Sequence, residues 1–191
     1  EEENSKTENP PTDWLGFYSH SKGLDKISAP IIGICPERVN NCVNKDKELM
    51  VYLTAKVIMH EFAHARIAYY SQGNYKPVDE FYKWMEESSA NFITLNQFER
   101  LSNFYKSNGI IYTTEPLDFV KRFIANQPNH YRLGLDLFEG KKVWFSHIWE
   151  SHKITINNRI KEKNDWLNYV KSNVGNINKS YLNQLNKALW R

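Results

Sequence analysis

Hydrophobic and polar positions follow a helical period over two long segments of the chain. Between residues 46 and 71 there is no proline or glycine, and apolar side chains return every three or four positions. This spacing is typical of a helix with one buried face, because residues three or four apart lie on the same side. Asn44 or Asp46 is suited to cap its start, and Gly73 and Pro77 mark its end. The buried stripe consists of Leu49, Met50, Leu53, Val57, His60, His64, Ile67 and Ala68.

A second helical segment runs from about residue 79 to residue 106. Before the first helix, an apolar run at residues 31–34 lies between Pro30 and Pro36. It predicts a strand at a sheet edge, because proline cannot donate a ladder hydrogen bond. Five further segments have helical spacing, at residues 115–126, 131–139, 143–160, 165–172 and 179–190. We therefore predict an α+β fold that is predominantly helical, with a small sheet before the first long helix.

The length and composition predict one folded domain. A chain of 191 residues and 22.6 kDa is long enough for a hydrophobic core of its own. Residues 1–13 are acidic, polar and contain proline, so we expect a disordered lead-in. Residues 14–106 should hold the strand and both long helices, and residues 107–191 a helical C-terminal lobe. The chain does not start with Met. An extracytoplasmic mature form and an excised domain are both compatible with this, and the compartment stays open.

The first long helix carries the motif His60-Glu61-Phe62-Ala63-His64. Residues four apart on a helix lie one above the other, so both imidazoles project from one face and can share a metal ion. The intervening glutamate points beside that ion, where a reacting water would lie. Two histidines satisfied by hydrogen bonds in a core are the simpler alternative. Because the pair brackets a glutamate, we favour a metal site.

The third metal ligand is expected on the second long helix. Glu87 shares a stripe with Trp84, Asn91, Leu95 and Phe98, so it faces the interior, where an unpaired carboxylate is costly. A metal ion would supply the missing positive charge. Asn91, one turn further on, is placed to orient a metal ligand without binding the metal itself. Glu86 is the competing ligand, on a less apolar stripe, and we favour Glu87.

The motif at residues 60–64, together with the run E-S-S-A-N at residues 87–91, resembles the gluzincins. In these zinc metallopeptidases H-E-x-x-H is followed on the next long helix by E-x-x-A-N or E-x-x-x-D. The resemblance covers about residues 30–95 and implies a zincin-like fold with one catalytic Zn²⁺. It implies His60, His64 and Glu87 as metal ligands, Glu61 as the general base, and Asn91 as a residue that orients the ligands without binding the metal. The expected activity is hydrolysis of peptide bonds in a protein or peptide.

Two further groups of candidate residues follow from this hypothesis. In gluzincin-like folds the strand before the active-site helix holds the substrate backbone, a role for Ile32, Gly33 and Ile34. A plain buried strand is the alternative. The oxyanion formed during hydrolysis needs a donor, and His130 and Tyr131 are our candidates. His147 and His152 remain rivals for that role.

Charge and composition limit the range of partners. A net charge of +3 with scattered lysines and arginines does not favour nucleic-acid binding, and the sequence has no membrane-spanning run. Cys35 and Cys42 could form a disulfide or remain thiols. The oligomeric state is left open. Two other functions also stay open: a catalytically quiet sensor or interaction domain, and a metal-dependent hydrolase of a non-peptide substrate.

Overall fold

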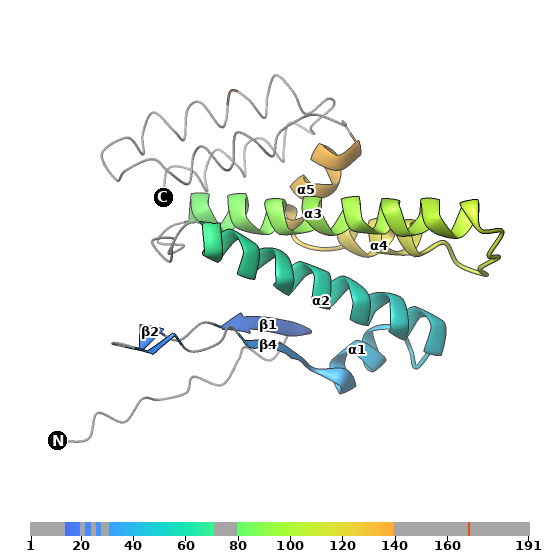
Figure 1. Ribbon diagram of the computed structural model, residues 1–191, viewed down its shortest axis with the longest axis horizontal. Coiled ribbons are helices and arrows are strands. Elements are labelled where there is room, and N and C mark those ends of the chain that lie inside the picture. Colours follow the sequence, from blue (N-terminus) through green and yellow to red (C-terminus); the bar gives the residue numbers. More distant parts are fainter. Residues whose placement is uncertain are drawn as a thin grey trace.

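The computed structural model describes residues 14–19, 22–23, 26–27, 31–70, 80–139 and 168, and over these the chain is mostly helical (Figure 1). Strand β1 pairs antiparallel with β4, and β2 pairs with β3. The α+β architecture and the small sheet before the long helix agree with the sequence prediction. The strands are β1 (Gly16–Ser19), β2 (Lys22–Gly23), β3 (Lys26–Ile27) and β4 (Ile31–Ile34). The helices are α1 (Pro36–Cys42), α2 (Lys47–Tyr70), α3 (Glu80–Ser107), α4 (Pro116–Ala125) and α5 (Asn129–Glu139).

Helix α2 starts where the sequence predicts. The backbone N–H of Leu49 donates to Asp46 Oδ1 at 3.0 Å, so Asp46 is the cap of α2. Asn44 instead lies in the preceding turn with a φ of 51°. Asparagine tolerates this left-handed conformation better than most residues. Of the two candidate caps, Asn44 and Asp46, the structure therefore selects Asp46.

The sheet lies against α2, and α3 packs on the other side of that helix, running antiparallel to it (Figure 1). Strand β4 occupies residues 31–34 as predicted, but β1 and α1 were not predicted. Gly16 of β1 lies so close to α2 that a Cβ atom there would clash with Val57 and lie 3.4 Å from Glu61 Cγ. A residue without a side chain therefore allows β1 to approach the motif helix.

The core forms where α2, α3, α4 and α5 meet. Its fully buried large side chains include one from each of these helices: Leu53, Leu95, Ile124 and Leu133. Each such leucine or isoleucine contributes about 1.5–3 kcal/mol by leaving water. The described part of the predicted C-terminal lobe, α4 and α5, thus packs directly on the two long helices.

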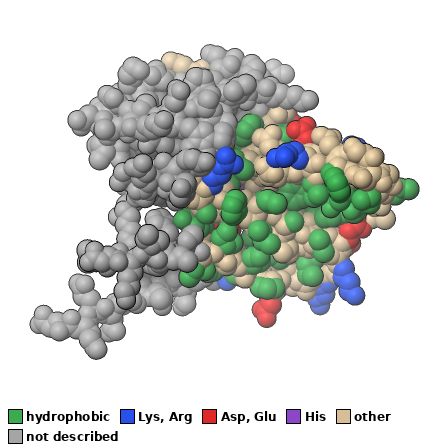
Figure 2. Space-filling model, in the orientation of Figure 1, with side chains coloured by type: hydrophobic (Ala, Val, Ile, Leu, Met, Phe, Trp, Pro, Cys, Tyr) green, Lys and Arg blue, Asp and Glu red, His purple; other side chains and the backbone are tan. Residues whose placement is uncertain are grey.

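Some apolar side chains remain on the surface among the described residues. Figure 2 shows hydrophobic side chains spread over the face that displays α2 and α3. On α2 the exposed ones are Val51, Ile58, Met59 and Phe62. Within the described ranges, no helix combines the length and the apolar character needed to cross a bilayer. The predicted lead-in at residues 1–13 and the helices predicted at 143–160, 165–172 and 179–190 fall outside these ranges, apart from residue 168, which is helical.

Candidate metal centre

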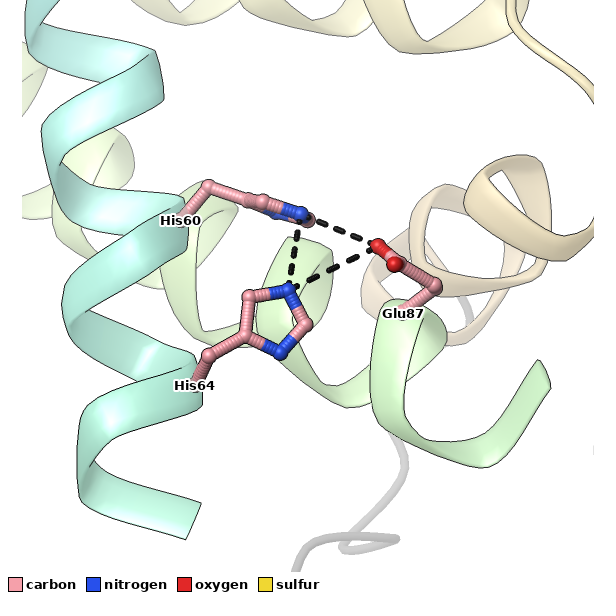
Figure 3. A group of neighbouring side chains, drawn as sticks. All are labelled: His60, His64 and Glu87. Atoms are coloured by element: carbon pink, nitrogen blue, oxygen red, sulfur yellow. Dashed lines mark hydrogen bonds and ion pairs between the residues drawn. The ribbon is translucent and has the colours of Figure 1, made fainter. Parts of the chain in front are cut away.

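Three side chains from the two long helices converge in one place (Figure 3). His60 and His64 project from α2, and Glu87 reaches them from α3. His60 Nε2 lies 3.0 Å from Glu87 Oε2 and 3.2 Å from His64 Nε2. The distance from His64 Nε2 to Glu87 Oε2 is 3.7 Å. All three side chains are largely buried, with 7%, 12% and 18% of their surface exposed.

These separations suit a shared metal ion. Two protein ligands held tetrahedrally at zinc's usual bond lengths of about 2.0–2.2 Å lie about 3.3 Å apart. The observed separations of 3.0, 3.2 and 3.7 Å lie around that value. Two imidazoles and one carboxylate also form a donor set typical of catalytic zinc. The group formed by His60, His64 and Glu87 could therefore hold a metal ion.

Glu86, the competing candidate for the third ligand, has a different position. Its Oε1 lies 2.8 Å from His64 Nδ1, the ring nitrogen that faces away from His60 and Glu87. When Nε2 of a histidine binds a metal, Nδ1 carries the proton. The Nδ1–H group then donates a hydrogen bond to such a carboxylate, which fixes the orientation of the ring. Glu86 and Glu87, adjacent in sequence, thus lie at the two different nitrogens of the His64 ring. The corresponding nitrogen of His60, Nδ1, is buried without a hydrogen-bond partner among the described residues.

The two histidines differ in their affinity for a proton. Burial lowers the pKa of His60 to about 3, and the charge of Lys56 acts in the same direction. Burial also acts downward on His64, but hydrogen bonds with Glu86 and Glu87 outweigh it and raise its pKa well above the usual value. For Glu87, burial acts upward, yet hydrogen bonds with the two histidines hold its pKa well below the usual value. Without a metal, the carboxylates therefore retain a proton on His64.

Glu61 lies in the same cavity as the three candidate ligands. Its residue is 9% exposed, and β1 passes over it at Gly16. Burial raises the pKa of Glu61; the charges of His64 and Lys56 act against this, and those of Glu87 and Glu86 act with it.

Helix α5 brings both predicted oxyanion candidates to the cavity. His130 and Tyr131 line it, and the Tyr131 ring centroid lies 5.9 Å from that of His60. Burial, followed by the charges of Glu87 and Glu61, raises the pKa of Tyr131, so its hydroxyl keeps its proton and can donate. The sequence treated His130 and Tyr131 as equivalent. The ring contact places Tyr131 beside one of the candidate ligands.

The close approach of α5 to α3 depends on Gly134. A Cβ atom there would lie 2.5 Å from the carbonyl oxygen of Ser88 and 2.8 Å from Asn91 Cβ. Two side chains of α3 also donate to the start of α5: Ser88 Oγ to the His130 carbonyl at 3.0 Å, and Asn91 Nδ2 to the Tyr131 carbonyl at 3.1 Å. Glycine and these two bonds hold Tyr131 over the candidate centre.

Asn91 is fully buried, as the stripe predicts, and its amide positions α5 through Tyr131. Its Oδ1 is buried without a hydrogen-bond partner among the described residues. The role predicted for it, orienting a ligand directly, stays a prediction.

The candidate centre lies in a cavity of about 440 Å³. Its wall includes β1 rather than β4, so Ile32, Gly33 and Ile34 are not among its lining residues. Instead they pair with β1, Gly33 opposite Phe17 and Ile32 opposite Tyr18. Their predicted role in substrate binding stays a prediction. The rival histidines His147 and His152 lie outside the described residues.

Sequence reasoning missed several cavity residues. Trp14, Phe17 and Tyr18 come from β1 and its start, which showed no clear strand pattern. Lys56 lies on α2, one turn before His60, and is only 4% exposed. Burial lowers its pKa to about 8, against the charges of Glu87 and Glu61. Its spacing of four residues from His60 was the signal that could have identified it.

Cys35 and Cys42 are free thiols, which excludes a disulfide between them in this structure. No protein-family model matches the chain, and no curated protein or solved structure matches it either.

Proposed function

We propose that this chain is a zinc-dependent metallopeptidase of zincin-like fold that hydrolyses peptide bonds in a protein or peptide. The convergence of His60, His64 and Glu87 beside Glu61, in one cavity, is the observation that carries the proposal. Antiparallel packing of the motif helix on the glutamate-bearing helix, with a sheet on the other side, supports the proposed fold. Zinc is proposed because two imidazoles and one carboxylate suit it.

With zinc bound, the three candidate ligands would leave a coordination position for a reacting molecule. Among the described residues the group contains three side chains, and a catalytic zinc site typically has three protein ligands and one open position. When bound, zinc would supply a Lewis acid that polarises the substrate carbonyl and lowers the pKa of water. Glu86 would hold His64 with Nε2 directed toward the ion, through the 2.8 Å contact at Nδ1.

Glu61 is the proposed general base. Its carboxylate would take a proton from the attacking water and return it to the leaving amine. Tyr131, with its hydroxyl protonated, would donate a hydrogen bond to the oxygen that becomes negative as the carbonyl is attacked. His130 lines the same wall and is the second candidate donor.

The substrate would lie along β1. This strand lines the cavity, and within the described ranges it pairs along one edge, with β4. An extended peptide can add to the other edge by main-chain hydrogen bonds. Ile32, Gly33 and Ile34 would then act by holding β1 in register. The cavity volume of about 440 Å³ is within the range of about 300–1,000 Å³ that is usual for ligand sites.

The test combines metal content with hydrolysis. Purified protein should contain about one zinc per chain, and His64→Ala should lose it. The wild type should then cleave an unfolded protein such as reduced casein, with new amino termini as the readout. Absence of metal, even after zinc is added, would refute the metal site. Bound zinc with no cleavage of any peptide would favour the quiet domain or the non-peptide hydrolase.

A further inference from the structure

Lys56 lies in the wall of the candidate active-site cavity but has no role in the proposed chemistry. It belongs to the same face of α2 as His60 and His64, one turn before the first of them. Its residue is only 4% exposed. Lys56 is nevertheless one of the residues that line the cavity. A cation is therefore built into the binding site itself.

The charge of Lys56 lacks a close anionic partner in the described part of the chain. No carboxylate there forms an ion pair with its ammonium group. Its described contact is with the face of the Phe123 ring, whose centroid lies 5.8 Å from Nζ. Glu61 and Glu87 act on it only through longer-range charge. A buried ammonium group is costly unless it is paired, so an anion entering the cavity would be stabilised there.

A second polar group of the cavity wall is also incompletely bonded. Gln127, in the turn after α4, lines the cavity with Lys56. Its Oε1 is buried and has no hydrogen-bond partner among the described residues. This oxygen is an acceptor, so it can bind a backbone N–H of the substrate next to an anion held by Lys56. The two residues together favour a ligand that carries both a hydrogen-bond donor, for Gln127, and a negative charge, for Lys56.

We propose that Lys56 binds a carboxylate group of the substrate, so that the enzyme selects peptides with a carboxylate close to the scissile bond. This inference rests on the proposed peptidase function. The carboxylate could be the C-terminus of the peptide or an aspartate or glutamate side chain. Four residues along a helix correspond to about 6 Å, and an extended peptide advances about 3.3 Å per residue. The carboxylate is therefore placed within about two residues of the bond that is cleaved.

The test measures binding rather than turnover. The parent is the zinc-loaded Glu61→Gln protein, in which substrate is expected to bind without being cleaved. Isothermal titration calorimetry compares acetyl-Ala-Ala-Ala with its C-terminal amide, and acetyl-Ala-Glu-Ala-amide with acetyl-Ala-Gln-Ala-amide. The first pair reports on a terminal carboxylate and the second on a side chain. A charge-assisted hydrogen bond to a buried lysine predicts a preference of about 10- to 100-fold for the carboxylate in at least one pair.

Three variants in this parent assign the preference. Lys56→Met keeps the volume and removes the charge, so it should abolish the preference. Lys56→Arg keeps the charge and should retain part of it. Lys47→Met is the matched control, because Lys47 is an exposed lysine at the start of the same helix. It should leave the preference unchanged. Far-UV circular dichroism and zinc content are measured on each protein, and Lys56→Gln replaces Lys56→Met if the latter does not fold.

The outcomes separate this inference from the proposed function. Equal affinities in both peptide pairs, a preference that survives in Lys56→Met, or no measurable binding at millimolar concentration would each overturn the role of Lys56. Zinc content is recorded on the same samples. If the parent binds no zinc, the metallopeptidase proposal fails. The carboxylate preference is then measured on the metal-free protein and still reports on Lys56.

Discussion

The contrast between Glu86 and Glu87 is the sharpest test of the candidate centre. The two residues are adjacent in sequence, yet one lies against Nδ1 of His64 and the other lies near Nε2 of both histidines. If zinc binds at the Nε2 atoms, Glu87→Gln removes a ligand, and Glu86→Gln only weakens the support of one. Both variants must lower zinc affinity, and Glu87→Gln must lower it more.

The magnitude for Glu86 follows from its contact. The 2.8 Å separation from His64 Nδ1 is that of a charge-assisted hydrogen bond, and the Glu86 side chain is only 18% exposed. Such a bond contributes about 1.5–3 kcal/mol, which is about 10- to 100-fold in an equilibrium constant. Because the glutamine amide oxygen can still accept a hydrogen bond from Nδ1–H, Glu86→Gln should lower zinc affinity by only about tenfold. Glu86→Ala should lower zinc affinity by about 100-fold, as removal of the hydrogen-bond partner of a metal-binding histidine does in other proteins.

The assay is competition for zinc with a fluorescent chelator at fixed pH, with wild type measured beside each variant. Glu99→Gln is the matched control, since Glu99 lies on α3 and outside the cavity lining. It should leave zinc affinity unchanged. If Glu86→Gln bound zinc as tightly as Glu99→Gln, the support of His64 by Glu86 would be refuted. If Glu86→Gln lost more affinity than Glu87→Gln, the third ligand would move by one residue.

Three further predictions test the chemistry and the fold. Glu61→Gln should retain zinc and a wild-type circular dichroism spectrum but lose hydrolysis, and unchanged turnover would remove its role as the base. Tyr131→Phe should lower kcat by about 10²- to 10³-fold with zinc content unchanged, as expected for a lost oxyanion donor; an unchanged kcat would leave His130 as the candidate. Burial raises the pKa of Asp136 to about 6 from 3.8, so the folded chain binds more protons between these values and stability falls as pH rises through them. Asp136→Asn should therefore stabilise the fold at neutral pH by on the order of 1–2 kcal/mol, allowing for partial exposure, and have no effect below a pH of about 4 in thermal melts.

Local patterns in the sequence were sufficient for the long helices. The periods of α2 and α3 are continuous over many turns, and Asp46 provides a cap. The pairing of His60 with His64 follows from helical geometry alone, because residues four apart on one face are adjacent in any helix. The choice of Glu87 over Glu86 also followed from the sequence, because the more apolar stripe faces the interior.

The sequence did not reveal elements whose stability depends on tertiary contacts. Strand β1 is four residues long and forms only by pairing with β4 and lying on α2 through Gly16. Strands this short have little pattern of their own, since their side-chain environment comes from neighbours distant in sequence. The cavity wall formed by β1 was therefore not predicted.

The sequence by itself determined which residue types could form the candidate centre and that two helices carry them. Only the tertiary structure decided the orientation of those helices. It places Glu87 near Nε2 of both histidines and Glu86 at Nδ1 of His64. It also decided that Gly134 allows α5 to place Tyr131 beside His60. The physical reason is range. Helix period and capping act within a few residues, whereas a shared metal group and a cavity require side chains brought together across 22 or more positions by packing.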